Sequence, residues 1–119
     1  MRVFNQLVFD QVVTGTAEAV SSSEFNDLLG KSMALYYEVE VCQVSGTNPA
    51  ITVKHKASNS GRGFKDHSTL VNAQALSGTP PLRFVGQAPG PLGGLGQVAV
   101  SLGGADNTAN VKIWACGRG

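Results

Sequence analysis

The sequence predicts an all-β domain, a sandwich or barrel of about eight short antiparallel strands. Short runs rich in Val, Ile, Phe, Tyr and Thr are separated at close intervals by clusters of Gly, Pro, Ser and Asn. Several of the runs alternate apolar and polar residues, the period of a half-buried strand. Fifteen glycines also suit a protein with many turns better than a helical one.

The predicted strands cover residues 4–13, 32–44, 50–58, 64–72, 82–86, 97–102 and 110–115. Alternation assigns an inward face to four of them. The expected inward residues are Leu35, Tyr37, Val39 and Val41; Ile51, Val53, His55 and Ala57; Val98, Val100 and Leu102; and Val111, Ile113 and Ala115. The stretch 21–31, SSSEFNDLLGK, has the spacing of a capped helical turn and is interpreted as either a single turn or a polar connection.

The loop SGTNP (45–49) has the composition of a hairpin turn between residues 34–44 and 50–58. We expect Val41 to lie opposite Val53 in that hairpin, so that both apolar faces coincide. Glu40 then faces Lys54 and Glu38 faces Lys56, and each pair contributes about 0.2–1 kcal/mol. A further hairpin is expected around residues 64–72, after the SNSGRG turn.

The bulk composition bounds the class of protein. A chain of 119 residues fits one domain, with residues 1–13 as an arm or an edge strand. Only 14% of the residues are charged, against about 25% in ordinary domains, so part of the surface is either covered by a partner or polar without charge. The net charge of +1 gives no footprint for nucleic acid.

The start, MRVFNQLVFDQVV, lacks the unbroken apolar run of a signal peptide, and no run approaches a membrane helix. We therefore expect synthesis in the cytoplasm and no membrane partner.

Motifs for catalysis are missing: the sequence holds no GxSxG, no P-loop and no HExxH. His55 is expected to be buried and satisfied, and His67 in KDHST to be exposed. Asp106 in GGADNT is interpreted as a turn residue, with a calcium site there as the alternative. We expect no catalytic residue, cofactor or metal.

Two cysteines, Cys42 and Cys116, form no CxxC pair. A chain made in the cytoplasm keeps its thiols reduced, so both are expected to be free.

Some apolar residues exceed what a small sandwich core needs, and they are candidates for a protein interface. Trp114 has the parity opposite to Val111 and Ile113, which predicts an outward position. The N-terminal run has apolar residues at both parities, and the loop APGPLGGLG carries two leucines. The candidates are Val3, Phe4, Leu7, Phe9, Leu92, Leu95 and Trp114.

One segment, LYYEVEVCQVSGTNPAITVKHKAS (35–58), resembles a pattern of small virion proteins of tailed bacteriophages, in which a strand ends in a Val-Ser-Gly-Thr-x-Pro turn and an ITV-type strand follows. LSGTPP, PLGG and the ending VSLGGADNTANVKIWACGRG (100–119) are similar.

The resemblance implies a jelly-roll-like β-sandwich, with no catalytic residues, in a phage particle. It implies a capsid decoration, or cement, protein that binds the major capsid protein as a homo-oligomer. The alternative is a carbohydrate-binding or adhesin-type sandwich, for which Tyr36 and Trp114 are the candidate aromatic platform.

Overall fold

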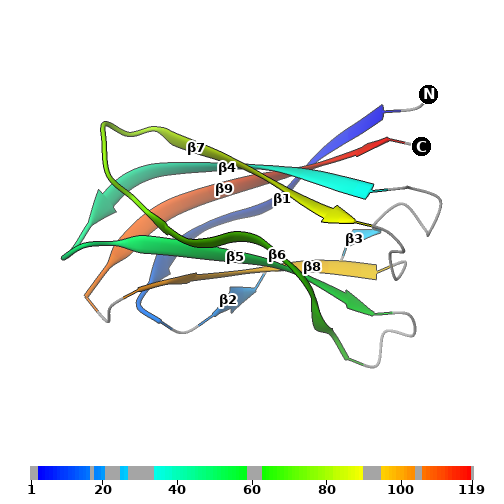
Figure 1. Cartoon of the computed structure of the whole chain (residues 1–119), viewed down its shortest axis with the longest axis horizontal. Coiled ribbons are helices and arrows are strands. Elements are labelled where there is room, and N and C mark those ends of the chain that lie inside the picture. The colour runs from blue at the N-terminus through cyan, green and yellow to red at the C-terminus, as the bar shows by residue number, and fades with distance from the viewer. Residues whose placement is uncertain are drawn as a thin grey trace.

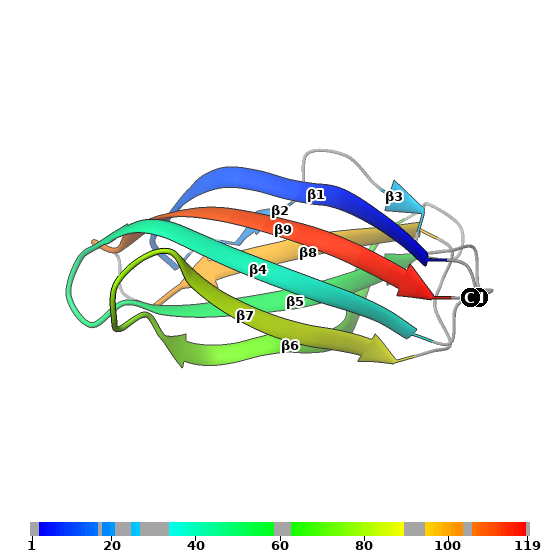
Figure 2. The ribbon, with the colours of Figure 1, turned by 90° about the horizontal axis from the view of Figure 1, so that it is seen from above.

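The computed structural model describes residues 3–16, 18–20, 25–26, 34–58, 63–89, 95–103 and 106–118. These residues form two antiparallel sheets that pack face to face (Figures 1 and 2). The strands are β1 (Val3–Thr14), β2 (Ala19–Val20), β3 (Phe25–Asn26), β4 (Ala34–Ser45), β5 (Ala50–Ser58), β6 (Lys65–Ala75), β7 (Leu82–Pro89), β8 (Leu95–Leu102) and β9 (Thr108–Arg118). The predicted jelly-roll-like β-sandwich is confirmed.

Sheet A has the strand order β1-β9-β4-β7, and sheet B has the order β2-β8-β5-β6. The short strands β2 and β3 both pair with β8, one after the other along the same edge. Sheet B is therefore also four strands wide. The N-terminal residues 3–14 form an edge strand of sheet A, and pair with β9 from Val3 opposite Arg118 to Thr14 opposite Thr108.

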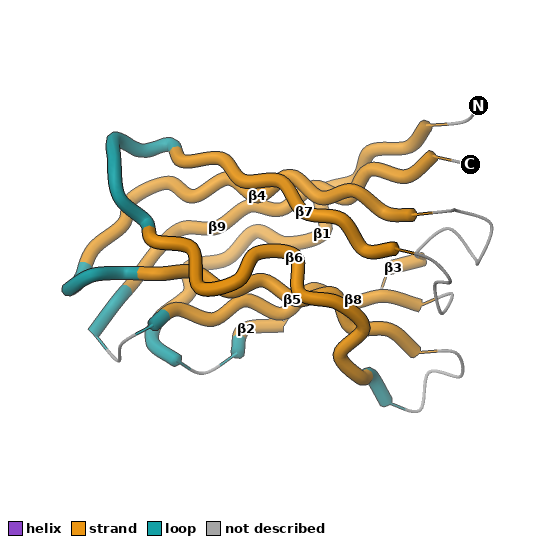
Figure 3. Tube along the Cα trace, in the orientation of Figure 1, coloured by secondary structure: helices purple, strands orange, loops and turns teal. Residues whose placement is uncertain are grey.

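The connections mostly cross from one sheet to the other. The β5–β6 hairpin joins hydrogen-bonded neighbours, which confirms the second hairpin expected from the sequence. The β4–β5, β6–β7 and β8–β9 connections each pass between the sheets at the same end of the sandwich (Figure 3). Both chain ends lie at the opposite end (Figure 1).

The predicted hairpin between residues 34–44 and 50–58 is wrong, because β4 belongs to sheet A and β5 to sheet B. Val41 and Val53 are both fully buried, but they belong to different sheets and so lie in different layers of the core. Alternation fixes which face of a strand is buried, and that condition is met equally by strands in one sheet or in two. The neighbours of β4 are β7 and β9 instead.

The crossing after β4 is held by Gly46 and Asn107. Gly46 has φ +115°, and a Cβ added there would lie 2.7 Å from the Asn107 Cα. Asn107 is completely buried, and its side-chain amide donates to the Gly103 carbonyl. Its own carbonyl accepts the Gly15 N–H at 2.9 Å. The chain segments that follow β1, β4 and β8 therefore meet at this one asparagine.

The core confirms the inward residues predicted for β8 and β9, Ile51, Val53 and His55 of β5, and Tyr37, Val39 and Val41 of β4. Ala57, also predicted to face inward, is half-buried, and the side chain of Leu35 lies outside the described residues. His55 lies in this core with no exposed surface, as expected. The Tyr37 hydroxyl and His55 Nδ1 are 2.6 Å apart. Since these side chains come from different sheets, their hydrogen bond ties the two layers together.

Most of the possible helical turn at 21–31 lies outside the described residues, and its residues 25–26 form β3. No helix long and apolar enough to cross a membrane occurs among the residues that the structure describes.

Candidate functional site on the outer face of sheet A

The outer face of sheet A carries regular rows of side chains, because residues paired across neighbouring strands point the same way. One row runs Leu7, Trp114, Glu38 and Val85 from β1 to β7. The next row, one pleat along, runs Asp10, Lys112, Glu40 and Arg83. The first row is thus apolar around one carboxylate, and the second alternates negative and positive charge.

The exposed large apolar side chains of the described residues also lie on this face. Among the side chains that the structure describes, the large hydrophobic residues that are exposed are Leu7 (46%), Val12 (62%), Tyr36 (42%) and Val85 (79%). All four point outward from sheet A, since their neighbours in the register are the outward Trp114, Asn110, Cys116 and Glu38. A solitary soluble domain seldom gathers its exposed apolar groups in this way.

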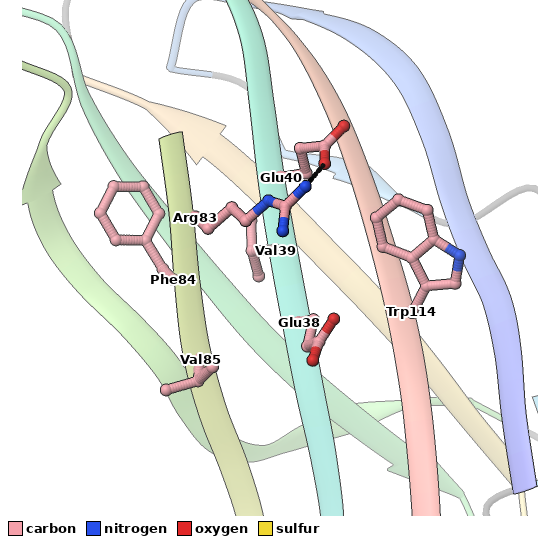
Figure 4. Close-up of a pocket in the computed structure, with 7 residues that line it drawn as sticks. All are labelled: Glu38, Val39, Glu40, Arg83, Phe84, Val85 and Trp114. Carbon is pink, nitrogen blue, oxygen red and sulfur yellow. Dashed lines mark ion pairs between the residues drawn. The ribbon is translucent and has the colours of Figure 1, made fainter. Parts of the chain in front are cut away.

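A hollow of about 370 Å³ lies on this face over β4, lined by Glu38, Glu40, Arg83, Val85 and Trp114, among others (Figure 4). Arg83 reaches from β7 across β4, and its Nη2 lies 3.3 Å from Glu40 Oε2. Trp114 lies on the other side of β4, on β9 (Figure 4). The hollow therefore combines an aromatic ring, two carboxylates and a guanidinium group.

A second hollow of about 340 Å³ continues along the same face, lined by Asp10, Gln11, Val12, Cys42, Gln43, Asn110 and Lys112. The Cys42 thiol donates to Glu40 Oε1 at 3.5 Å. Partial burial and this hydrogen bond raise the pKa of Cys42 above its ordinary value. The thiol is therefore protonated at neutral pH and is a poor nucleophile.

The outer face of sheet B carries its own cluster of ion pairs. Lys54 Nζ lies 3.3 Å from Asp66, and Lys56 Nζ lies 3.0 Å from Glu18 and 3.7 Å from Asp66. The hydrogen bond to Glu18 raises the pKa of Lys56. The predicted pairs Glu40–Lys54 and Glu38–Lys56 are therefore wrong: the acids lie on sheet A, and the lysines take partners on their own side.

The interface candidates from the sequence fall in different places. Leu7 and Trp114 both lie on the outer face of sheet A, where Leu7 is exposed and Trp114 half-buried. Val3 and Phe4 belong to β1, and Leu95 begins β8. Leu92 lies outside the described residues.

The prediction that Phe9 is an interface residue is wrong, because Phe9 is 2% exposed and belongs to the core. Leu7 and Phe9 share a parity, but a β-bulge lies between them in the pairing with β9. The extra residue turns the two side chains to opposite faces.

Sequence reasoning did not find Val85 or Arg83. In LRFVG the two apolar residues Phe84 and Val85 are adjacent, so the pattern does not show which one faces the core. The structure packs Phe84 partly against the core and leaves Val85 outside. The charge of Arg83 was a usable signal, because it shares a face with Val85 and predicts that face to be outward.

The two histidines lie against each other. His67 is half-buried instead of exposed, and its ring meets His55 edge-on with centroids 5.2 Å apart. Its Nδ1 lies 3.1 Å from the Ser68 hydroxyl. Asp66, the carboxylate adjacent in sequence, pairs with Lys54 and Lys56.

No group of three or more metal-ligating side chains occurs within the described ranges. Asp106 is an exposed turn residue that accepts a hydrogen bond from the Thr47 hydroxyl at 3.4 Å. Neither Cys42 nor Cys116 forms a disulfide. Cys116 pairs with Tyr36 on β4, six residues from Cys42, so the Cα atoms of the two cysteines are about 20 Å apart, too far for a disulfide between them.

The fold defines the chain as a jelly-roll-like β-sandwich, and comparisons with known proteins agree. No family model and no curated protein matches the sequence. The CBM22-1 xylan-binding domain from Paenibacillus barcinonensis Xyn10C has a similar fold, with a TM-score of 0.61 and 13% identity over 97% of this chain and 80% of that chain. PirA matches with a TM-score of 0.54 and 12% identity, over 90% of this chain and 91% of that one.

A chain in the structure of infectious bursal disease virus Gx strain matches with a TM-score of 0.60 and 8% identity. The match covers 97% of this chain but only 32% of the viral one. At these identities the likenesses establish the β-sandwich fold alone, which is used by proteins of different functions.

Proposed function

We propose that this chain is a non-enzymatic structural protein of a tailed-phage virion, a decoration protein that binds the major capsid protein shell. The observation that carries the proposal is the outer face of sheet A, where Leu7, Val12, Tyr36 and Val85 are all exposed. Covering such a face stabilises an assembly by about 25 cal/mol per Å² before the costs of association. The face therefore fits a part of a larger protein assembly better than a solitary protein.

Two further observations support a virion as that assembly. The turn and strand patterns of residues 35–58 and 100–119 resemble those of small phage virion proteins. The same sandwich fold also occurs in a chain of a virus particle of another kind. On this proposal the protein is made in the host cytoplasm and ends in the capsid as a homo-oligomer.

The test is incubation of the purified protein with capsids of the phage that encodes it, followed by sedimentation. We expect the protein to leave the supernatant and to saturate at a fixed ratio to the major capsid protein. Gold-labelled antibodies against the protein should then mark the particle surface in electron micrographs. A protein that stays in solution, with unlabelled mature particles, would overturn the proposal.

The hollow over β4 supports a second candidate, a carbohydrate-binding module. Trp114 beside Glu38, Glu40 and Arg83 offers an aromatic surface with hydrogen-bonding groups, the combination that recognises sugars. The similarity in fold to a xylan-binding domain agrees with this candidate. A glycan array separates the two: specific binding to one glycan, lost in Trp114→Ala, would favour the carbohydrate-binding module.

A further inference from the structure

The signs of the charges in the charged row on sheet A are all reversed when the row is read in the opposite direction. From β1 to β7 it holds Asp10, Lys112, Glu40 and Arg83, so the charges run negative, positive, negative, positive. From β7 to β1 the signs are reversed. Two copies placed face to face, and related by an axis parallel to the strands, therefore bring every charge against its opposite.

We infer that a second copy of this chain covers the outer face of sheet A, with the twofold axis running along the strands between β9 and β4. In this dimer Lys112 faces Glu40 of the partner subunit, and Glu40 faces Lys112 of the partner subunit. Asp10 and Arg83 meet in the same reciprocal way at the edges. Such reciprocity is the rule for a twofold interface.

The neighbouring row, from Leu7 on β1 to Val85 on β7, also forms favourable contacts about this twofold axis. Leu7 on β1 and Val85 on β7 lie at opposite edges of the row, so each faces the other across the interface. Both are exposed in the single chain and would cover one another. Trp114 faces Glu38 of the partner subunit, whose carboxylate can accept the indole N–H.

The alternative axis, perpendicular to the strands, is disfavoured by charge. Where such an axis passes through this row, it places Asp10 against Asp10 of the partner subunit and Lys112 against Lys112 of the partner subunit, and like charges across an interface repel. The charges therefore select one orientation, and the apolar groups supply most of the affinity.

The area is sufficient for a stable dimer. The four strands of sheet A have 8 to 12 residues each. At about 4.8 Å between strands and about 3.3 Å per residue, the face measures roughly 650 Å². Complete contact between two such faces would bury at most about 1,300 Å², at the lower end of the range of specific protein interfaces. Packed sheets twist relative to each other, so the contact is closest along the centre, where Lys112 and Glu40 lie.

The inference rests on the proposed function, in which this face is covered inside a protein assembly, and it assigns the face to a second copy of the chain. The capsid shell then contacts another part of the dimer. The test uses two single charge reversals, Lys112→Glu and Glu40→Lys, in sedimentation velocity. The wild type is expected to sediment with twice the mass of one chain. Each variant alone places like charges opposite each other at two points and should sediment as a monomer.

An equal mixture of the two variants should recover the dimer. Position 112 of one chain then faces position 40 of the other with opposite charge, at both points. Mixing changes no contact within either chain, so recovery can come only from the interface. Lys54→Glu, on the outer face of sheet B, is the matched control and should remain a dimer. Circular dichroism checks that each variant is folded.

A wild-type protein that is monomeric at every concentration would overturn the inference, and so would a mixture that stays monomeric. Capsid binding is measured separately. A monomer that binds capsids would refute the dimer and leave the proposed function standing, whereas a dimer that ignores capsids would do the reverse.

Discussion

Replacing Gly46 by alanine is expected to destabilise the sandwich at the point where the chain crosses from sheet A to sheet B. Gly46 has φ +115°, and an L-residue held in such a region costs about 1–3 kcal/mol. The new Cβ would also lie 2.7 Å from the Cα of buried Asn107, and forcing a methyl group into a filled site costs about 1–3 kcal/mol. Together these effects lower the free energy of unfolding by about 2–6 kcal/mol. At about 4 °C per kcal/mol, Tm falls by at least roughly 8 °C.

Urea denaturation and thermal melting measure this change, and Gly78→Ala is the matched control. Gly78 has φ +106°, close to that of Gly46, but its added Cβ would meet only the Leu82 Cδ2 at 3.5 Å, an ordinary contact. The control therefore isolates the cost of the backbone conformation. If both variants lose the same stability, the contact between Gly46 and Asn107 contributes nothing, and the account of the crossing is wrong.

Three other changes test the core, the thiol and the metal prediction. Tyr37→Phe removes the hydrogen bond to buried His55 and should lower the free energy of unfolding by about 1–3 kcal/mol in urea titrations. Glu40→Gln removes one cause of the raised pKa of the Cys42 thiol, so more of the thiolate forms at mildly alkaline pH. Alkylation of Cys42, measured by mass spectrometry, should therefore be faster in this variant than in the wild type. EDTA should leave Tm unchanged, and a large drop would point to a metal at the Asp106 turn.

The strands and their buried faces could be predicted from the sequence because alternation is a local property. Tyr37, Val39 and Val41 repeat with period two, and the structure buries all three. Sheet membership could not be predicted in this way. β4 and β5 bury their apolar faces equally well as neighbours or as opposing layers. The crossing between the sheets brings together Gly46 and Asn107, which are 61 positions apart in the sequence, and a local pattern does not show such a contact.

The candidate site was predictable only in part. The parity of Trp114 gave its outward position, since β9 is regular from Val111 to Ala115. In β1 the alternation of odd and even positions did not predict which side chains face outward, because the bulge between Leu7 and Phe9 reverses the faces beyond it. No residue type at that point indicates a bulge. The charged row could not be predicted from the sequence, because its residues come from four strands and the sequence does not reveal the order of those strands in the sheet.

The direction of the proposed twofold axis has a consequence for binding to a shell. An axis parallel to the strands keeps both copies pointing the same way, so corresponding ends of the two sandwiches lie side by side. The dimer would present two identical ends to one surface, and two linked contacts can bind 10²–10⁴ times more tightly than one by the general arithmetic of avidity. Lys112→Glu alone should therefore bind capsids much more weakly than the wild type, and mixing it with Glu40→Lys should restore most of the loss in the sedimentation assay. If the monomeric variant binds capsids as tightly as the wild type, the dimer contributes nothing to attachment, and each copy docks alone.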